Sequence, residues 1–232
     1  RRQRQMCIRD RNYFCHYGDT TLLEEHYCGM KYWVEYLNTR TDDKGIVVRE
    51  EPNGWCLGEW STPHNVIEIP ASLVNTAYFY HVTCIMANIA NILNKKDDEN
   101  ELRILARTIK RNFNIAFYNE VTHHYWEGKQ GADVFALAFG LVPESDRKKV
   151  FAALLEHLEK INYHFDTGIL ATPLLLKVLT ENGRADLAYR VMNQRDFPSY
   201  GYLADKKNNT LWETWNGDGN DEGCGYCHPM FG

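Results

Sequence analysis

Apolar side chains recur three and four positions apart along most of the chain, which is the spacing of one face of an α-helix. The stretch 20–39 shows this spacing clearly. Its apolar positions are Leu22, Leu23, Tyr27, Met30, Trp33, Val34 and Leu37. Comparable patterns predict six further helices, at 65–95, 99–119, 131–142, 144–161, 172–183 and 184–194. Strand patterns are few, and the best of them covers residues 199–205.

Short turns and longer loops alternate between these predicted helices. The longer loops are rich in Trp, Gly, Pro and Asn, and they cover residues 50–65, 119–130, 162–171 and 196–220. Helical hairpins that stack in this way predict an all-α fold, an alpha/alpha toroid whose aromatic-rich loops gather at one rim. Because functional residues are concentrated in loops on a rigid scaffold, we expect a site at that rim.

The composition excludes several classes of protein. Apolar residues make up 44% of the 232 residues and charged residues 25%, which predicts a packed core rather than disorder. The net charge of -5 argues against nucleic acid as a partner, because nucleic acid calls for a basic face. No run of about 18 apolar residues is present, so no membrane span is expected.

The seven cysteines have irregular spacing, and a chain of this size does not need disulfide bonds for its stability. We therefore expect free buried thiols, which favour a reducing compartment such as the cytoplasm. Cys224, Cys227 and His228 also form the C-x-x-C-H pattern of haem attachment, or half of a zinc site. No second Cys or His pair with ligand spacing accompanies them, so no cofactor and no metal are expected.

The first eleven residues differ from the rest of the chain. Residues 1–11 contain five arginines and show neither a helical nor a strand period. No apolar segment follows them, so they do not form a signal peptide. We interpret residues 1–11 as an artefactual or disordered leader, with a basic tail as the alternative, and residues 12–232 as part of a folded domain.

One carboxylate lies among aromatic residues in the last loop. Glu213 stands between Trp212 and Trp215 in the stretch "NTLWETWNGD". Tryptophan is costly to expose and glutamate is costly to bury, so the combination needs an explanation. In a structural explanation the two rings belong to the core and Glu213 is a charge at a helix N-terminus. In a functional one the rings hold a reactive carboxylate.

Several motifs follow one another in the order of a known family. They are "YGDTTLLEEHYCGMKYWVEYL", "GWCLGEW", "FGLVPESDRKKV", "DTGILATPLLLKVLTENGRADLAYRVMNQRDFPSYGYL", "NTLWETW" and "HPMFG". Over residues 12–232 the chain resembles the catalytic domain of bacterial alpha-L-rhamnosidases, glycoside hydrolase family seventy-eight. The resemblance implies a six-hairpin (alpha/alpha)6 barrel of twelve helices, of which about seven are expected here as an incomplete toroid.

The resemblance also implies a reaction. The family removes terminal alpha-L-rhamnosyl residues from glycosides or polysaccharides with inversion, using one carboxylic acid and one carboxylate. Glu213 matches the carboxylate, the general base that activates water. The family's general acid belongs to an arginine- and aspartate-rich motif upstream of the "YGD" segment. That motif is absent from residues 1–232, so we expect these residues alone to be inactive.

Other residues match or suit a sugar site. Rhamnose carries a methyl group and apolar C–H faces, which favour an aromatic wall. Trp60 matches a family tryptophan, Glu59 stands where the family usually has Asp and could contact sugar hydroxyls, and His228 matches a histidine that contacts them. The remaining expected members of the wall are Trp55, Trp126, Trp212 and Trp215. For each of these tryptophans core packing is the competing explanation.

Two other functions fit the same features. Another six-hairpin glycosidase, such as one that acts on glucosides, would share the fold and the carboxylate. A catalytically silent carbohydrate-binding relative would share the aromatic wall. His123 and His124 have no partner cluster in the sequence, and we expect them in an exposed turn.

Overall fold

The computed structural model describes residues 2–48, 58–64, 68–206, 210–216 and 225. These residues form nine helices and one short hairpin. The helices are α1 (Arg2–Tyr17), α2 (Thr21–Asn38), α3 (Ala71–Ile92), α4 (Lys96–Phe117), α5 (Gln130–Phe139), α6 (Arg147–Lys160), α7 (Thr172–Glu181), α8 (Ala185–Met192) and α9 (Tyr200–Asp205). The hairpin pairs β1 (Tyr118–Asn119) with β2 (His124–Tyr125). None of these nine helices is both long and apolar enough to cross a membrane.

The chain divides into two compact units. The first comprises Arg1–Cys56 and Asn75–Ala116, and the second comprises Leu57–Val74 and Phe117–Gly232. The first unit contains α1, α2 and most of α3 and α4, whereas the second contains the hairpin and α5 to α9. Each of the seven helices predicted from the sequence overlaps one helix of the structure.

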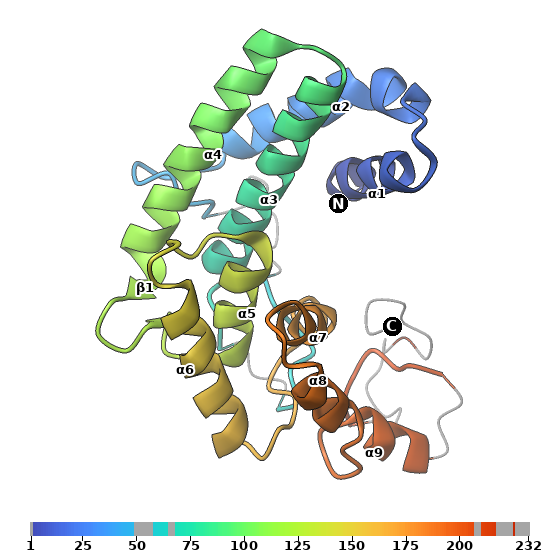
Figure 1. Cartoon of the computed structure of the whole chain (residues 1–232), viewed down its shortest axis with the longest axis vertical. Helices are drawn as coiled ribbons and strands as arrows, with labels where there is room; N and C mark the ends of the chain where they lie inside the picture. Colours follow the sequence, from blue (N-terminus) through green and yellow to red (C-terminus); the bar gives the residue numbers. More distant parts are fainter. Residues whose placement is uncertain (1, 49–57, 65–67, 207–209, 217–224, 226–232) are drawn as a thin grey trace. The chain divides into compact units, whose positions relative to one another are not determined.

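The core of the first unit forms on the apolar faces predicted from the sequence. In α2 the buried side chains are Leu23, Tyr27, Met30, Val34 and Leu37, which follow the three-to-four spacing. They join one apolar cluster with side chains from α3 and α4, the two longest helices, which run side by side (Figure 1). The hydroxyl of Tyr27 and the Nζ atom of Lys31 both donate to the Asp98 carboxylate, which ties α2 to the first turn of α4.

The segment 1–11, interpreted from its sequence as an artefactual or disordered leader, is helical where the structure describes it. Its described residues belong to α1, and Cys7 and Asp10 are fully buried. The reason is tertiary packing, because Cys7 belongs to the apolar cluster of the first unit. The Asp10 carboxylate also accepts a hydrogen bond from Arg9 and lies 2.7 Å from Nδ1 of His26 on α2.

The second unit is built from short helices. α5 contacts both α6 and α7, and α7 contacts α8 (Figure 1). The helix α5 is buried along nearly its whole length, as expected for an Ala-rich apolar stretch. The turn between α7 and α8 lies at Asn182 and Gly183, where Gly183 adopts a positive φ of 79°.

The prediction of a strand at residues 199–205 is wrong. The structure has α9 at these positions, and Ser199 is its N-cap, because the Ser199 side chain accepts a hydrogen bond from the backbone N–H of Tyr202. A serine that satisfies one of the free N–H groups of the first turn favours a helix start over extended backbone.

Candidate active site

Glu213 lies in the loop 210–216, which follows α9, and it is fixed by two hydrogen bonds to one residue. Its backbone N–H donates to the Gly225 carbonyl oxygen at 2.9 Å, and the Gly225 N–H donates to its Oε2 atom at 2.8 Å. The backbone and the carboxylate of Glu213 are therefore held together. The residue is partly exposed, so Glu213 combines a fixed position with partial access to solvent.

Trp215 anchors the Glu213 segment in the interior. It is only 2% exposed, and its ring stacks on Phe165 with 5.0 Å between ring centroids. Its indole Nε1–H donates to the Thr167 carbonyl oxygen at 3.1 Å. Trp212, in contrast, is half-buried. The two rings that flank Glu213 therefore have different environments, and Trp215 has that of a core residue.

The predicted motif that contains Glu59 and Trp60 contacts the loop 165–172, which also holds the indole of Trp215. The backbone N–H of Ile169 donates to the Trp60 carbonyl oxygen at 2.9 Å. The N–H of Ala171 donates to Oε1 of Glu59 at 3.0 Å, across 112 positions of sequence. The loop 165–172 thus lies between the Glu59–Trp60 segment and Trp215.

The carboxyl group of Glu59 is enclosed by protein. The residue is 1% exposed, and its Oε2 atom is buried without a hydrogen-bond partner. Burial raises the pKa of Glu59 to about 8, although the backbone N–H groups of Ala171, Gly168 and Leu170 act in the opposite direction. The side chain therefore faces backbone donors of the loop rather than open solvent.

This pKa predicts how stability depends on pH. Because the folded-state pKa of about 8 lies above the unfolded value of 4.5, the contribution of Glu59 is fully present below 4.5 and is lost as pH rises through 8. Glu59→Gln has no titrating group at this site. We expect the variant to gain stability relative to wild type as pH rises from about 5 to about 9, measured by urea unfolding. Parallel pH profiles of the two proteins would contradict this assignment.

Gly168 is required by the close approach of this loop to Glu59 and Trp60. A Cβ atom at this position would overlap the Trp60 carbonyl oxygen and lie 2.9 Å from Oε1 of Glu59. Backbone cannot move aside as a flexible side chain can, so the loop would have to shift.

Gly168→Ala should therefore lower the free energy of unfolding by about 1–3 kcal/mol, the usual effect of overpacking. Gly29→Ala is the matched control, because Gly29 lies within α2 and a Cβ there meets nothing within 4 Å. The control should raise stability by about 0.5–1 kcal/mol, since alanine favours a helix interior more than glycine does. Thermal unfolding of both variants measures the difference, and equal effects would show that the loop has room for a side chain.

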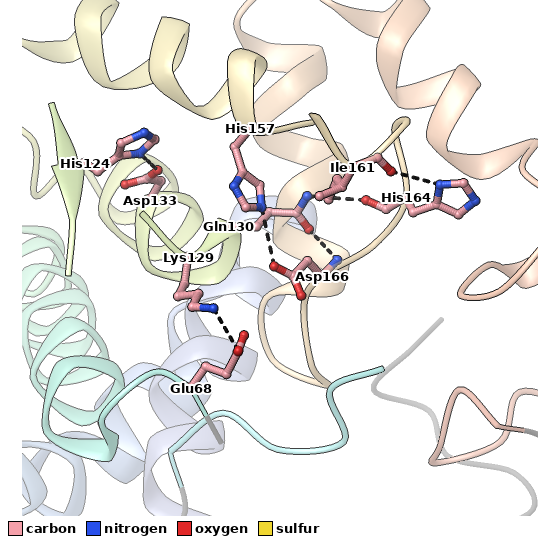
Figure 2. Close-up of polar contacts among 9 residues, drawn as sticks. All are labelled: Glu68, His124, Lys129, Gln130, Asp133, His157, Ile161, His164 and Asp166. Carbon is pink, nitrogen blue, oxygen red and sulfur yellow. Dashed lines mark hydrogen bonds and ion pairs between the residues drawn. The ribbon is translucent and has the colours of Figure 1, made fainter. Parts of the chain in front are cut away.

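Trp126 is exposed at the end of the hairpin and is held in an uncommon backbone conformation. Its φ is 52°, its N–H donates to the Phe117 carbonyl oxygen at 2.7 Å, and its side chain is 39% exposed. Its indole Nε1–H donates to the Glu68 carbonyl oxygen at 3.1 Å. The Glu68 carboxylate forms an ion pair of 2.8 Å with Lys129 (Figure 2). The ring is thus fixed while part of it stays accessible.

The N-terminus of α5 joins Trp126 and Lys129 to the loop 165–172. Gln130 is fully buried, and its Oε1 atom accepts the N–H of Asp166 at 3.0 Å, while the Asp166 carboxylate lies 3.4 Å from Nε2 of His157 (Figure 2). A Cβ at Gly131 would meet Ile69, Ala171 and Thr167, which shows how closely these segments pack. Described segments of the second unit, at 58–60, 68–70, 126–131 and 211–216, therefore lie close to the loop 165–172.

The structure shows a buried ion pair that the sequence did not reveal. Asp133 of α5 is fully buried, and its carboxylate lies 2.6 Å from Nδ1 of His124 (Figure 2). It also accepts the Tyr125 N–H at 2.7 Å. The hydrogen bond between His124 and Asp133 raises the pKa of His124, whereas burial raises the pKa of Asp133. The prediction that His124 lies in an exposed turn without a partner is wrong, because strand β2 presents it to α5.

Two predicted site residues belong to parts of the chain that the structure does not describe. Trp55 and His228 lie outside the described residues, as do Cys224 and Cys227 of the C-x-x-C-H pattern. Within the ranges that the structure describes, no group of three or more His, Cys, Asp and Glu side chains could hold a metal ion.

Helical hairpins that carry a fixed, partly exposed carboxylate among aromatic loops are the features of a six-hairpin glycosidase. Residues 4–232 match the family described as the bacterial alpha-L-rhamnosidase six-hairpin glycosidase domain, and the chain belongs to this family. An alpha-L-rhamnosidase of Streptomyces avermitilis is 34% identical over 205 residues, which are 86% of this chain and 18% of that protein. One of Formosa agariphila is 31% identical over 211 residues, which are 89% of this chain and 22% of that protein.

Solved structures agree with the sequence relatives. The alpha-L-rhamnosidase of Dictyoglumus thermophilum is 34% identical with a TM-score of 0.84, over 93% of this chain and 24% of that one. The Streptomyces avermitilis alpha-L-rhamnosidase in complex with L-rhamnose is 32% identical with a TM-score of 0.81, over 93% of this chain and 20% of that one. The prediction of an incomplete all-α six-hairpin toroid is confirmed. The chain spans about a fifth of the length of these relatives.

Proposed function

We propose that the protein to which this chain belongs is an inverting alpha-L-rhamnosidase, which hydrolyses terminal alpha-L-rhamnosyl residues of glycosides or polysaccharides. Membership of the family and the rhamnose complex of a similar structure support rhamnose as the sugar that is released. The observation that carries the proposal is that Glu213 is partly exposed and that its carboxylate is held by the Gly225 N–H.

Glu213 acts as the general base in this proposal. It takes a proton from a water molecule that attacks the anomeric carbon, while a carboxylic acid on the other face of the sugar protonates the departing oxygen. The acid is expected from the part of the domain that precedes this chain. A general base must keep its direction toward one water, and the N–H of Gly225 on Oε2 restricts the rotation of the carboxylate.

The aromatic residues have two roles in the proposal. Trp60, Trp212 and Trp126 are partly exposed and suit the apolar faces of a sugar ring, to which Trp55 and His228 would add further contacts. Trp215 is buried, so in this proposal it anchors the segment of Glu213 in the core and does not contact the sugar.

The test uses the full-length protein that contains this chain. We expect release of nitrophenol from an aryl alpha-L-rhamnoside but not from the matching aryl glucoside, and proton NMR during the first turnovers should show β-L-rhamnose as the initial product. Hydrolysis of the glucoside alone would indicate a different six-hairpin glycosidase. Binding of L-rhamnose without hydrolysis would indicate a catalytically silent relative.

A further inference from the structure

Hydrogen bonds at the two ends of one loop connect Glu59 with the segment of Glu213. The Ala171 N–H donates to Oε1 of Glu59, and the Ile169 N–H donates to the neighbouring Trp60 carbonyl oxygen. At the other end of the same loop, the Thr167 carbonyl oxygen accepts the indole N–H of Trp215. Two segments that are distant in sequence, 59–60 and 213–215, are therefore joined through residues 167–171.

The loop end near Glu59 has little freedom to move. Glu59 is 1% exposed, so the hydrogen bond from Ala171 is shielded from competing water. A Cβ atom at Gly168 would overlap the Trp60 carbonyl oxygen, so the loop cannot accept a side chain there without shifting. The Glu59 carboxyl group and the Trp60 carbonyl oxygen therefore both constrain the backbone of 168–171.

The other loop end is equally constrained. The Thr167 hydroxyl lies 2.7 Å from the Thr172 hydroxyl, which in turn donates to the Gly168 carbonyl oxygen. Trp215 is 2% exposed, with Phe165 at 5.0 Å and Tyr200 at 5.5 Å between ring centroids. A shift of the Thr167 carbonyl must therefore move the indole or break its hydrogen bond, and Trp215 is two positions from Glu213.

We propose that Glu59 is a positioning residue, which sets the location of the Glu213 carboxylate through loop 167–171 and Trp215 without touching the sugar. This inference rests on the proposed role of Glu213 as the general base. It replaces the expectation that Glu59 contacts sugar hydroxyls. Rates of proton transfer and attack depend on sub-ångström placement, so a small displacement affects turnover more than it affects sugar binding.

Two substitutions at Glu59 separate the hydrogen-bond acceptor from the packing. Glu59→Gln keeps an oxygen for the Ala171 N–H, and its amide resembles a protonated carboxyl group in shape. Glu59→Leu has similar volume but no acceptor, so the Ala171 N–H loses its partner. In the full-length enzyme we expect Glu59→Gln to stay within about threefold of the wild-type kcat, and Glu59→Leu to lose about 100-fold with KM within about threefold.

A third substitution tests the other end of the connection. Trp215→Phe keeps an aromatic ring to pack against Phe165 but removes the indole N–H that reaches Thr167. Its kcat should fall by about tenfold or more, again with little change in KM. This variant leaves Glu59 in place, so it tests the connection even if Glu59→Leu does not fold.

Hydrogen exchange measured by mass spectrometry supplies a readout that needs no enzymatic activity. Glu59→Leu should increase exchange in peptides covering 165–172 and 211–216, whereas Trp215→Phe should increase it in 211–216 and Glu59→Gln in neither. Peptides from α6 are the control and should not change. A selective change in the loop is expected only if the connection exists.

The outcomes distinguish this inference from the proposed function. Wild-type kcat in Glu59→Leu or in Trp215→Phe would overturn the positioning role, and so would unchanged exchange at 211–216 in both variants. An equal loss of kcat in Glu59→Gln and Glu59→Leu would also overturn it, because the acceptor would then not be the relevant feature. If the wild-type protein does not hydrolyse rhamnosides, the proposed function fails, while hydrogen exchange still tests the connection between Glu59 and the 211–216 segment.

Discussion

Glu213→Gln should lower kcat on an aryl alpha-L-rhamnoside by roughly 10²–10⁴-fold, the usual contribution of a general base. Glutamine keeps the shape of the side chain and an oxygen that can accept the Gly225 N–H, but it cannot take a proton from water. Binding of L-rhamnose, measured by calorimetry, should therefore change little.

The control for this substitution is Glu181→Gln. Glu181 lies at the end of α7, where it pairs with Lys177 at the surface and takes no part in the proposed site. The control should keep wild-type kcat. If Glu213→Gln also stays within about tenfold of wild type, a general base that contributes as much as such groups usually do is excluded at this position.

Asp133→Ala should lower the free energy of unfolding by about 3–5 kcal/mol, the typical cost of removing one partner from a buried ion pair. Asp133 is fully buried, and its loss removes its interaction with the His124 ring and the hydrogen bond that it accepts from the Tyr125 N–H. Chemical unfolding measures the change. Asp133→Asn should lie between wild type and Asp133→Ala, because its amide oxygen can still accept the Tyr125 N–H.

Asp186→Ala is the matched control for Asp133→Ala. Asp186 forms an ion pair of 2.8 Å with Arg184, but the side chains are 63% and 39% exposed, so solvent screens the interaction. The midpoint of unfolding should hardly move. Equal destabilisation by Asp133→Ala and Asp186→Ala would show that burial does not strengthen the His124–Asp133 pair.

Helix positions could be predicted from the sequence wherever one apolar face is long enough to repeat. Leu23, Met30, Val34 and Leu37 lie on one face of α2 and are buried as their spacing predicts. The hairpin β1–β2 escaped prediction because each strand has only two residues, too few for an alternating pattern. The prediction of a strand at residues 199–205 is wrong because the strand pattern is weak and the N-cap hydrogen bond of Ser199 favours a helix start.

Some residues of the candidate site could be predicted from the sequence, and others could not because only the fold brings their partners close. Glu213 is conspicuous because it stands beside two tryptophans in the sequence. Glu59 is not, because its partner Ala171 lies 112 positions away and only the fold brings them together. The polar residues Gln130 and Asp133 in the apolar stretch of α5 were a usable signal, since a buried polar side chain requires a partner.

The most direct test of the central claim, that Glu213 is the general base of an inverting alpha-L-rhamnosidase, is azide rescue of Glu213→Ala in the full-length enzyme. Azide is an anion and needs no base to attack the anomeric carbon, and the removed side chain leaves space for it. The account predicts that azide restores turnover of an aryl alpha-L-rhamnoside and that proton NMR identifies the product as β-L-rhamnosyl azide, with inverted configuration. An α-configured azide product, or a Glu213→Ala variant that hydrolyses the substrate at the wild-type rate without azide, would contradict it.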